Sequence, residues 1–196
     1  MLSQLEQLRL DYYRCYRKSR CKKMGFTKML RTLIFAYGLQ AMAIYRFGVW
    51  VKTAPGLAGM FPLRQVLRLL HALAEWAIHK AYGIHLSIEA EIGPGFVIGH
   101  FGGVVVESGT IGRNCAIQQH VKIKKDQAKG KVPIIGDNVW IGAHSAIVGC
   151  TIGDRATIAA GTCIDADIGD RNLVAGNPGR VVLTNYDNRE ILGIIV

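Results

Sequence analysis

An aliphatic residue returns at a nearly constant interval through the second half of the chain. The interval is six residues from Leu86 onward, with one extra residue before Ile111, a loop before Ile135 and one missing residue before Ile152. The full series is Leu86, Ile92, Ile98, Val104, Ile111, Ile117, Ile123, Ile135, Ile141, Ile147, Ile152, Ile158 and Ile164. A helix repeats its apolar positions every 3.6 residues and a strand every 2 residues, so neither explains an interval of six.

The neighbours of each aliphatic residue complete the repeat. Glycine often follows it directly, as in Ile92-Gly93, Ile98-Gly99, Ile111-Gly112, Ile135-Gly136, Ile141-Gly142 and Ile152-Gly153. Four places after it there is usually a small or β-branched residue, as at Ala90, Cys115, Val121, Val139, Ser145, Ala156 and Thr162. A parallel β-helix explains this pattern, because each hexapeptide forms one flat face and a corner. We expect the aliphatic residue to point inward, the small residue to fit where the wall turns, and glycine to supply unusual backbone angles.

The first part of the chain has a helical pattern. Residues 26–52 and 62–82 are apolar with scattered Arg and Lys, and glycine and proline lie between them. The longest uncharged stretch of this first part, residues 32–45, has fourteen residues and is too short to span a bilayer. Two hypotheses remain open: helices lying in a membrane interface, or a cap that packs on the β-helix or on a partner subunit. The predicted fold class is therefore α+β, with a basic, apolar helical region (1–82), a β-helix (83–183) and a C-terminal tail (184–196).

Charge and cysteine content limit the possible partners and the cellular compartment of the protein. Residues 1–80 hold fourteen Lys and Arg against three Asp and Glu, whereas residues 81–196 hold ten against eleven. The basic first part suggests an anionic partner, for which a membrane surface, a phosphorylated carrier and nucleic acid are candidates. We expect no nucleic acid partner. The five cysteines form no CxxC pair, and the first twenty residues lack the apolar core of a signal peptide. We therefore expect free thiols in the cytoplasm. If the helices lie in a membrane interface, the contact would be peripheral and on the inner face of the membrane.

Four segments carry a resemblance to a known family: residues 92–95 (IGPG), 99–106 (GHFGGVVV), 135–143 (IGDNVWIGA) and 175–182 (AGNPGRVV). With the repeat, they resemble the hexapeptide-repeat acyltransferases, and most closely the serine acetyltransferases and their relatives in exopolysaccharide O-acetylation. The resemblance implies a left-handed triangular prism and a homotrimer. It also implies acetyl-CoA as co-substrate, bound in the groove between neighbouring prisms.

The same resemblance implies roles for particular residues. His100 matches the family's catalytic base, and imidazole suits this role at neutral pH. The glycines after it, Gly102 and Gly103, suggest open backbone amides that could stabilise an oxyanion. Glu107 corresponds to a glutamate that orients the histidine or contacts the acceptor. We expect the coenzyme to lie along small corner residues, with a basic side chain on its phosphates; the candidates are Ala143, Ala160, Gly161 and Arg180. His120, one coil beyond His100, either lines the same groove or is an exposed wall residue.

The acceptor is less well defined. In serine acetyltransferases an aspartate precedes the catalytic histidine, and here Gly99 stands there. A second aspartate aligns with His85, and a second histidine aligns with Val132. Losing such contacts to a zwitterionic amino acid should lower discrimination by about 2 kcal/mol. We therefore expect a sugar hydroxyl of a polysaccharide or of its lipid-linked precursor as acceptor. His85 and His120 are the candidates for contact with the acceptor.

Two alternatives stay open. One is a serine O-acetyltransferase of cysteine biosynthesis, and the other is a non-catalytic trimeric β-helix scaffold. No metal is expected, because the chain has no closely spaced histidine pair of the kind that binds zinc in prism-shaped carbonic anhydrases.

Overall fold

The computed structural model of the chain describes residues 3–17, 36–57 and 60–193. The described residues of the first part form the α-helices α1 (Gln4–Arg17), α3 (Tyr37–Thr53) and α4 (Phe61–Tyr82), with a short 3-10 turn, η1 (Pro55–Leu57), before α4. Residues 26–35 of the first predicted helical segment lie outside the described residues. The helix α4 starts with proline in its first turn and ends at Gly83, whose φ of 63° only glycine adopts easily. Within the described ranges, no helix combines the length and the apolar character needed to cross a membrane.

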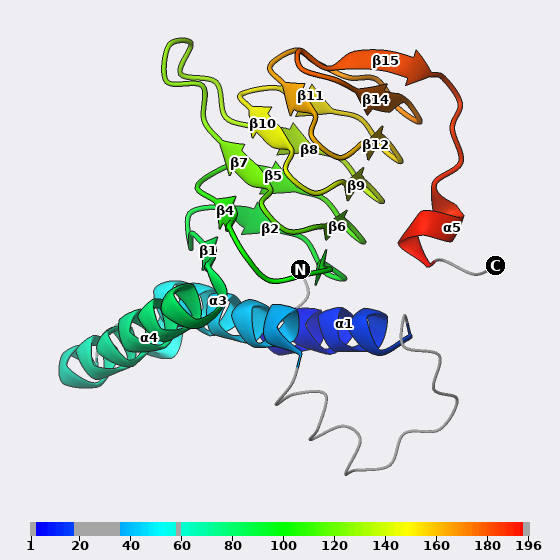
Figure 1. The fold of residues 1–196 in the computed structure, drawn as a ribbon. Helices are drawn as coiled ribbons and strands as arrows, with labels where there is room; N and C mark the ends of the chain where they lie inside the picture. Colours follow the sequence, from blue (N-terminus) through cyan, green and yellow to red (C-terminus); the bar gives the residue numbers. More distant parts are fainter. Residues whose placement is uncertain (1–2, 18–35, 58–59, 194–196) are drawn as a thin grey trace.

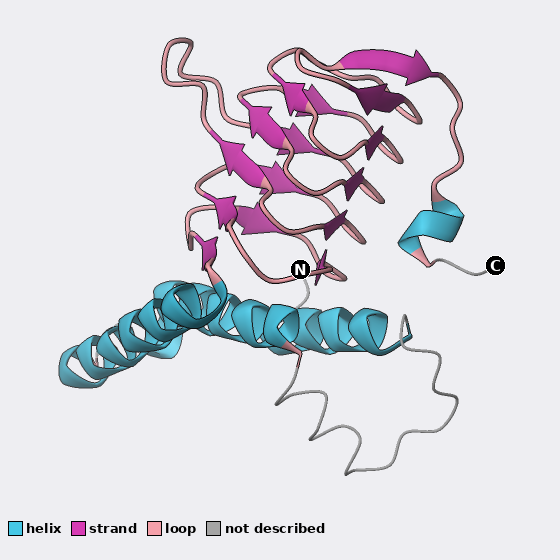
Figure 2. Cartoon of the chain, in the orientation of Figure 1, coloured by secondary structure: helices cyan, strands magenta, loops and turns pink. Residues whose placement is uncertain are grey.

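The second part is a parallel β-solenoid of about five turns, which confirms the predicted fold class and is consistent with a left-handed β-helix. Its coils stack above the helices (Figures 1 and 2). The first sheet contains β1 (Ile84–Leu86), β4 (Val104–Val106), β7 (Lys122–Lys124), β10 (Ala146–Val148) and β13 (Cys163–Ile164). The second sheet contains β2 (Glu91–Ile92), β5 (Thr110–Ile111), β8 (Ile134–Ile135) and β11 (Thr151–Ile152). The third sheet contains β3 (Val97–Ile98), β6 (Ala116–Ile117), β9 (Trp140–Ile141), β12 (Thr157–Ile158), β14 (Leu173–Ala175) and β15 (Arg180–Leu183).

The repeat positions line the interior as predicted. Every aliphatic residue of the series is buried, and so are the small residues four places later. The register keeps each column aligned: Ile92 pairs with Ile111, Ile111 with Ile135, and Ile135 with Ile152. Identical side chains therefore stack coil upon coil, and each coil completes the apolar core of the next.

The glycine after each aliphatic residue has a different role from the expected one. None of the six glycines in the Ile-Gly pairs has a positive φ. Instead, the next coil passes too close for a side chain: a Cβ at Gly136 would lie 2.9 Å from the backbone nitrogen of Asp154. A Cβ at Gly153 would lie 2.6 Å from that of Asp170. The expectation about backbone angles was wrong for these positions, and close packing between coils is the physical reason for the glycine.

Aspartate follows Gly136, Gly153 and also Gly169, and it ties successive coils together. Asp137 accepts a hydrogen bond at Oδ1 from the backbone N–H of Arg113 (2.6 Å). Asp154 accepts one from the N–H of Asp137 (2.7 Å), and Asp170 accepts one from that of Asp154 (2.9 Å). We call the line of corners between the second and third sheets (residues 93–96, 112–115, 136–139, 153–156 and 169–172) the aspartate edge.

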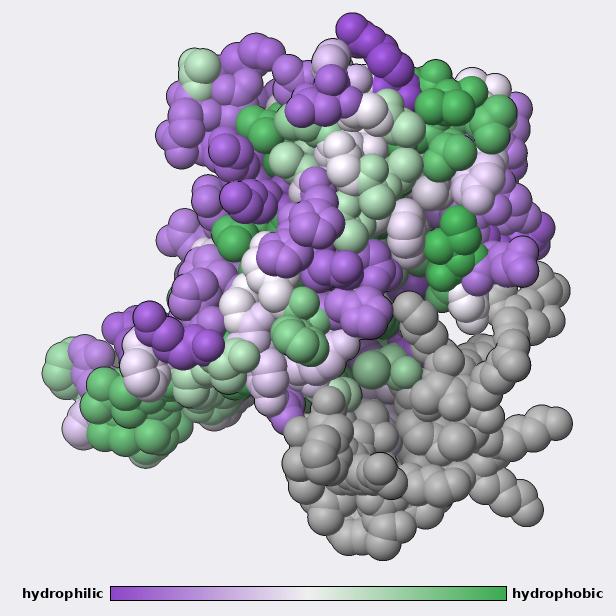
Figure 3. Space-filling view, in the orientation of Figure 1, coloured by the Kyte–Doolittle hydropathy of each residue, from purple (hydrophilic) through white to green (hydrophobic). Residues whose placement is uncertain are grey.

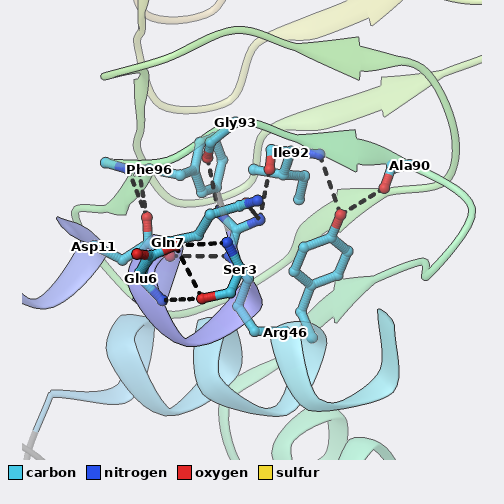
Figure 4. A network of polar contacts seen from close by, with 11 residues as sticks. Ser3, Glu6, Gln7, Asp11, Arg46, Ala90, Ile92, Gly93 and Phe96 are labelled. Carbon is cyan, nitrogen blue, oxygen red and sulfur yellow. Dashed lines mark hydrogen bonds and ion pairs between the residues drawn. The ribbon is translucent and has the colours of Figure 1, made fainter. Parts of the chain in front are cut away.

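The N-terminal helices close the lower end of the solenoid, where the first coil has no coil beneath it. Asp11 of α1 accepts hydrogen bonds at Oδ1 from the N–H groups of Gly95 (2.6 Å) and Phe96 (3.0 Å). Arg46 of α3 donates to the carbonyls of Ile92 (2.6 Å) and Gly93 (2.8 Å), and its Nε lies 3.1 Å from Asp11 Oδ2 (Figure 4).

Tyr45 completes this cap. Its hydroxyl donates to the carbonyl of Ala90 (2.6 Å) and accepts from the N–H of Ile92 (3.1 Å). Helix side chains thus satisfy the backbone groups that an uncovered coil would leave open. The hypothesis of a helical cap therefore describes α1 and α3.

The C-terminal end is covered by the chain's own last residues. Strand β15 runs antiparallel to β14, so the last parallel strand of this sheet is covered. The tail then returns along the third sheet, where Leu192 of α5 (Arg189–Leu192) packs with Val97, Ala116 and Trp140. The side chain of Asn188 holds the tail against the solenoid by donating a hydrogen bond to the carbonyl of Asn138 (2.9 Å).

Candidate active site

The corners that lead from the third sheet to the first form a second line along the solenoid, which we call the histidine edge (residues 99–103, 118–121, 142–145 and 159–162). Backbone hydrogen bonds connect its levels. The N–H of His120 donates to the carbonyl of Gly102 (2.8 Å), and that of His144 donates to Gln119 (3.0 Å). The N–H of Gly161 donates to Ala143 (2.8 Å). Three histidines, His100, His120 and His144, therefore occupy successive levels of one edge.

The corner that carries His100 is longer than the one above it. The chain takes seven steps from Ile98 to Val105 but only five from Ile117 to Lys122, their paired positions in the next coil. Two additional residues are therefore accommodated outside the regular wall. His100 and Phe101 are both exposed here, with Phe101 58% accessible. The extra length brings the predicted base into a position that a substrate can reach.

The helical cap holds this corner from below. The hydroxyl of Tyr37, at the start of α3, donates to the carbonyl of Gly99 (3.1 Å), and its ring meets Phe101 edge-on at 5.2 Å between centroids. Burial raises the pKa of Tyr37, so its hydroxyl keeps the proton it donates. The N–H of Gly102 donates to the carbonyl of Tyr82 (2.8 Å). That amide is therefore occupied, contrary to the expectation that both glycine amides are open.

His120 and His144 stack on each other. Their ring centroids lie 4.6 Å apart with an interplanar angle of 16°. The His120 ring also packs on Gly103, where any Cβ atom would clash with it. Gly103 therefore makes room for the imidazole of the next coil, whereas a Cβ at Gly102 would lie 3.6 Å from it, an ordinary contact. Both histidines have positive φ, 56° for His120 and 61° for His144, a conformation uncommon for residues with side chains.

His144 was not among the residues predicted for the site, and its stacking on His120 was not expected from the sequence. The two histidines are 24 residues apart, and a residue count through the inserted loop would have aligned them in neighbouring coils. Tyr37 was missed as well, and here no sequence pattern points to the contact. It lies 62 positions before Gly99, in a different kind of secondary structure.

The residues predicted to contact the coenzyme lie further along the same edge. Ala143 is in the third coil, and Ala160 and Gly161 are in the fourth. The backbones approach closely here, since a Cβ at Gly142 would lie 2.5 Å from the nitrogen of Ala160. Gly161 faces open space, because a Cβ there would meet nothing within 4 Å. Arg180 is the first residue of β15, where it pairs with Ala175 across the turn formed by residues 176–179. Its side chain is exposed.

Two other predicted residues lie apart from His100 within the chain. His85 of β1 faces α4, where its Nδ1 lies 3.0 Å from Glu75 Oε1 and its ring meets His79 at 6.1 Å. Glu107 lies past the opposite end of β4, roughly 13 Å along the strand from the histidine edge. The roles of both residues stay predictions, and a contact between Glu107 and His100 would need a second copy of the chain.

The position directly before His100 is filled by a neighbour. A Cβ at Gly99 would lie within 2.6 Å of both amide heteroatoms of Gln118, so Gln118 occupies the space into which a side chain at 99 would point. Val132 precedes Pro133, which accepts from Thr110 at the corner between the first and second sheets, away from the histidine edge.

The lysine-rich loop, residues 124–131, leaves the solenoid between β7 and β8. Lys131 lies 2.7 Å from Asp167, and Lys129 lies 3.8 Å from Asp126. Two of its four lysines are therefore paired with carboxylates of the chain, which weakens the loop as a site for an anionic ligand.

Among the described residues, the buried cysteines do not form a reactive thiol site and the acidic groups do not form a metal site. Of the five cysteines, Cys15, Cys115, Cys150 and Cys163 are free thiols, and Cys21 lies outside the described residues. Burial raises the pKa of Cys115 to about 12 and that of Cys150 to about 11, which keeps both thiols unreactive. In the part of the chain that the structure describes, no three His, Cys, Asp or Glu side chains are grouped so as to hold a metal.

Comparison with known proteins agrees with this architecture. Residues 133–166 match the family model described as the hexapeptide repeat of succinyl-transferase. The chain is 41% identical over 83 residues to "Putative acetyltransferase YvoF" of Bacillus subtilis, covering 42% of this chain and 48% of that protein. It is 28% identical over 157 residues to the serine acetyltransferase of Synechococcus elongatus, covering 78% and 60%. The chain spans about half the length of these curated relatives.

Solved structures give the same result. The soybean serine acetyltransferase complexed with serine superposes with a TM-score of 0.69 at 26% identity, covering 92% of this chain and 70% of that one. The serine acetyltransferase of Vibrio cholerae superposes with a TM-score of 0.77 at 22% identity, covering 98% and 70%. The chain thus combines a parallel β-solenoid fold with a match to a hexapeptide-repeat model over residues 133–166. Among proteins with this fold, it is similar to the serine acetyltransferases.

Proposed function

We propose that this protein transfers the acetyl group of acetyl-CoA to a hydroxyl group, with His100 as general base. The observation that carries the proposal is the histidine edge. An exposed histidine on an enlarged corner stands at one end of it, and a line of small corner residues leads from there towards Arg180. The relatives named as acetyltransferases support the same chemistry.

The small residues of the edge fit a coenzyme of this shape. Gly161 borders open space and Ala143 is half-buried, so an extended chain can approach the backbone there. Arg180 would meet the phosphate groups, for which a guanidinium is well suited. When bound, acetyl-CoA supplies an activated acetyl thioester. His100 would take the proton of the acceptor hydroxyl, and Tyr37 and Tyr82 would hold its corner in place.

L-Serine is the acceptor that the relatives favour. Several of them are named serine acetyltransferases, and the soybean structure is described as complexed with serine. The sugar hydroxyl expected from the sequence is a second candidate. One specific observation favours it: position 99 carries no carboxylate, and Gln118 fills the space beside it. The homotrimer also stays a proposal, and it would give Glu107 a route to the His100 of a neighbouring copy.

The deciding experiment is to measure the release of the CoA thiol from acetyl-CoA with L-serine and with a panel of glycans as acceptors. Turnover with serine supports the first candidate, and turnover only with glycans supports the second. If no acceptor is used, the result favours the non-catalytic scaffold. Measuring the melting temperature with and without CoA then distinguishes a scaffold from an enzyme whose acceptor was not in the panel. A ligand at 100 times its Kd stabilises the folded state by about 2.7 kcal/mol, and a scaffold that does not bind CoA would show no shift.

A further inference from the structure

The helix α4 keeps a broad apolar face away from the rest of the described structure. Of its side chains only His71 is buried, where the helix crosses α3 at Gly48. The opposite side carries six large apolar residues that are between 40% and 62% exposed: Leu63, Val66, Leu69, Leu70, Leu73 and Trp76. We call these six residues the α4 apolar face.

The spacing of these residues places them on one side of the helix. At about 100° per residue they fall within an arc of roughly 140°. Figure 3 shows apolar surface gathered on the projecting end of α4, away from the solenoid. Monomeric proteins rarely expose so continuous an apolar surface unless something binds there. The face therefore requires an occupant.

The charge of the residues around the α4 apolar face indicates which kind of partner would bind there. Arg68 and Lys80 on α4 and Lys52 at the end of α3 are exposed, while Glu75 faces His85. The first 80 residues hold fourteen basic and three acidic side chains. A second copy docking through this face would bring two strongly basic regions together, which electrostatic repulsion opposes. An anionic surface is attracted instead.

The chemistry of the face is that of a helix lying in a lipid interface. Such helices bury leucine and aromatic side chains at the level of the lipid head groups and keep basic residues on the flanks. Phe61 and Trp50, both exposed, extend the aromatic content of this region. We propose that the α4 apolar face binds the surface of a membrane rich in anionic lipids, with the helix lying in the interface. This inference does not depend on the proposed acetyl transfer.

The arrangement has a spatial consequence. The C-terminal end of α4 at Tyr82 holds the His100 corner through Gly102. A bilayer under α4 would thus lie on the helical side of the molecule, and His100 belongs to the coil nearest to it (Figure 1).

The test is co-sedimentation of the full chain with vesicles of phosphatidylcholine alone or mixed with phosphatidylglycerol. We expect binding to the mixed vesicles that weakens as salt is added. The double variant L69Q/L73Q keeps the charge and a good helix former at both sites, and it should bind at least about tenfold more weakly. The matched control Q65A/A72Q changes two exposed positions on the flank of α4, outside the α4 apolar face, and should bind within about twofold of the unchanged protein.

A second measurement follows the face through the fluorescence of Trp76 in the unchanged protein. Trp76 should enter the interface, so the fluorescence should shift to shorter wavelength with mixed vesicles. The shift should be smaller in W76F, where Trp50 and Trp140 remain. Absence of binding to mixed vesicles at low salt would overturn the proposal. So would equal binding by L69Q/L73Q and the control. If L69Q/L73Q instead converts a larger assembly into a smaller one in light scattering, another copy of the chain covers this face and the proposal is wrong.

Discussion

The aspartate edge and the histidine edge are built from the same repeat but are used differently. On the aspartate edge, glycine and aspartate recur from coil to coil, and Asp137, Asp154 and Asp170 each bind the backbone of the coil before it. On the histidine edge the corner residues change at every level, from His100 to His120, His144 and Gly161. Of these two edges, only the histidine edge has a corner with two additional residues, the corner that carries His100.

The difference indicates how a repetitive fold can acquire a site. Where side chains satisfy backbone groups of a neighbouring coil, a change in one coil also affects the coil that it contacts. On the histidine edge the backbone ladder joins the coils, and Ser145 Oγ adds a bond to the carbonyl of Ala159 (3.0 Å). The exposed histidines of this edge make no such bond to the backbone, so they can vary and meet solvent. The edge with the less regular sequence is therefore the one on which chemistry can be placed.

The largest expected difference between the edges is in activity. Changing His100→Ala should lower acetyl transfer about 10²- to 10⁴-fold, because a general base contributes an effect of that size. The melting temperature should stay the same, since the side chain is exposed. Arg113→Ala, an exposed residue of the aspartate edge, is the matched control and should keep full activity. Normal turnover by folded His100→Ala protein would remove His100 from the mechanism.

Gly136→Ala should give the next largest effect, this time on stability. The new Cβ would lie 2.9 Å from the nitrogen of Asp154 and 3.0 Å from the carbonyl carbon of Gly153. We expect the free energy of unfolding to fall by about 2 kcal/mol, as in overpacked cores. Gly169→Ala is the control at the same corner of the last coil, where only Asn172 Nδ2 lies near, at 3.3 Å. Denaturant titration should find Gly169→Ala nearly neutral; equal losses would refute the coil-contact explanation.

A smaller contrast concerns the side chains themselves. Asp154→Ala removes the acceptor for the N–H of Asp137 and should lower the free energy of unfolding by about 1 kcal/mol. His144→Ala removes an exposed ring stacked on His120 and should change it by less than about 0.5 kcal/mol. Thermal unfolding of the two variants measures both. A larger loss for His144→Ala would mean that the histidine edge also carries the stability of the stack.

The smallest effect is in thiol reactivity. Cys115 lies on the aspartate edge with its pKa raised to about 12 by burial, so at pH 8 only on the order of one molecule in 10⁴ carries its thiolate. Cys163, which follows the histidine edge, is partly exposed. Iodoacetamide at pH 8 should therefore modify Cys163 in the folded protein and leave Cys115 unmodified. Peptide mass mapping would detect this, and modification of Cys115 without unfolding would contradict its burial.

Much of the fold could be predicted from the sequence. The six-residue interval identified the solenoid, because neighbouring coils are related by a short and regular distance along the chain. The spacing placed His100, His120 and the small residues Ala143, Ala160 and Gly161 at corners, whereas their predicted roles came from the resemblance to a known family. The role of the glycines was misjudged, since the spacing alone does not distinguish unusual backbone angles from close contact between coils.

The sequence by itself therefore determined the repeat, the inward positions and the candidate base. Only the tertiary structure decided which side chains surround that base and how the solenoid is closed. The cap joins Asp11 and Arg46 to backbone groups of residues 92–96, and Tyr37 to Gly99, across separations of 46 to 85 positions. It also decided that α3 is covered while the α4 apolar face is not, although both helices are rich in apolar residues. The physical reason is that periodicity is a local property of the chain, whereas such contacts depend on where distant segments meet in space.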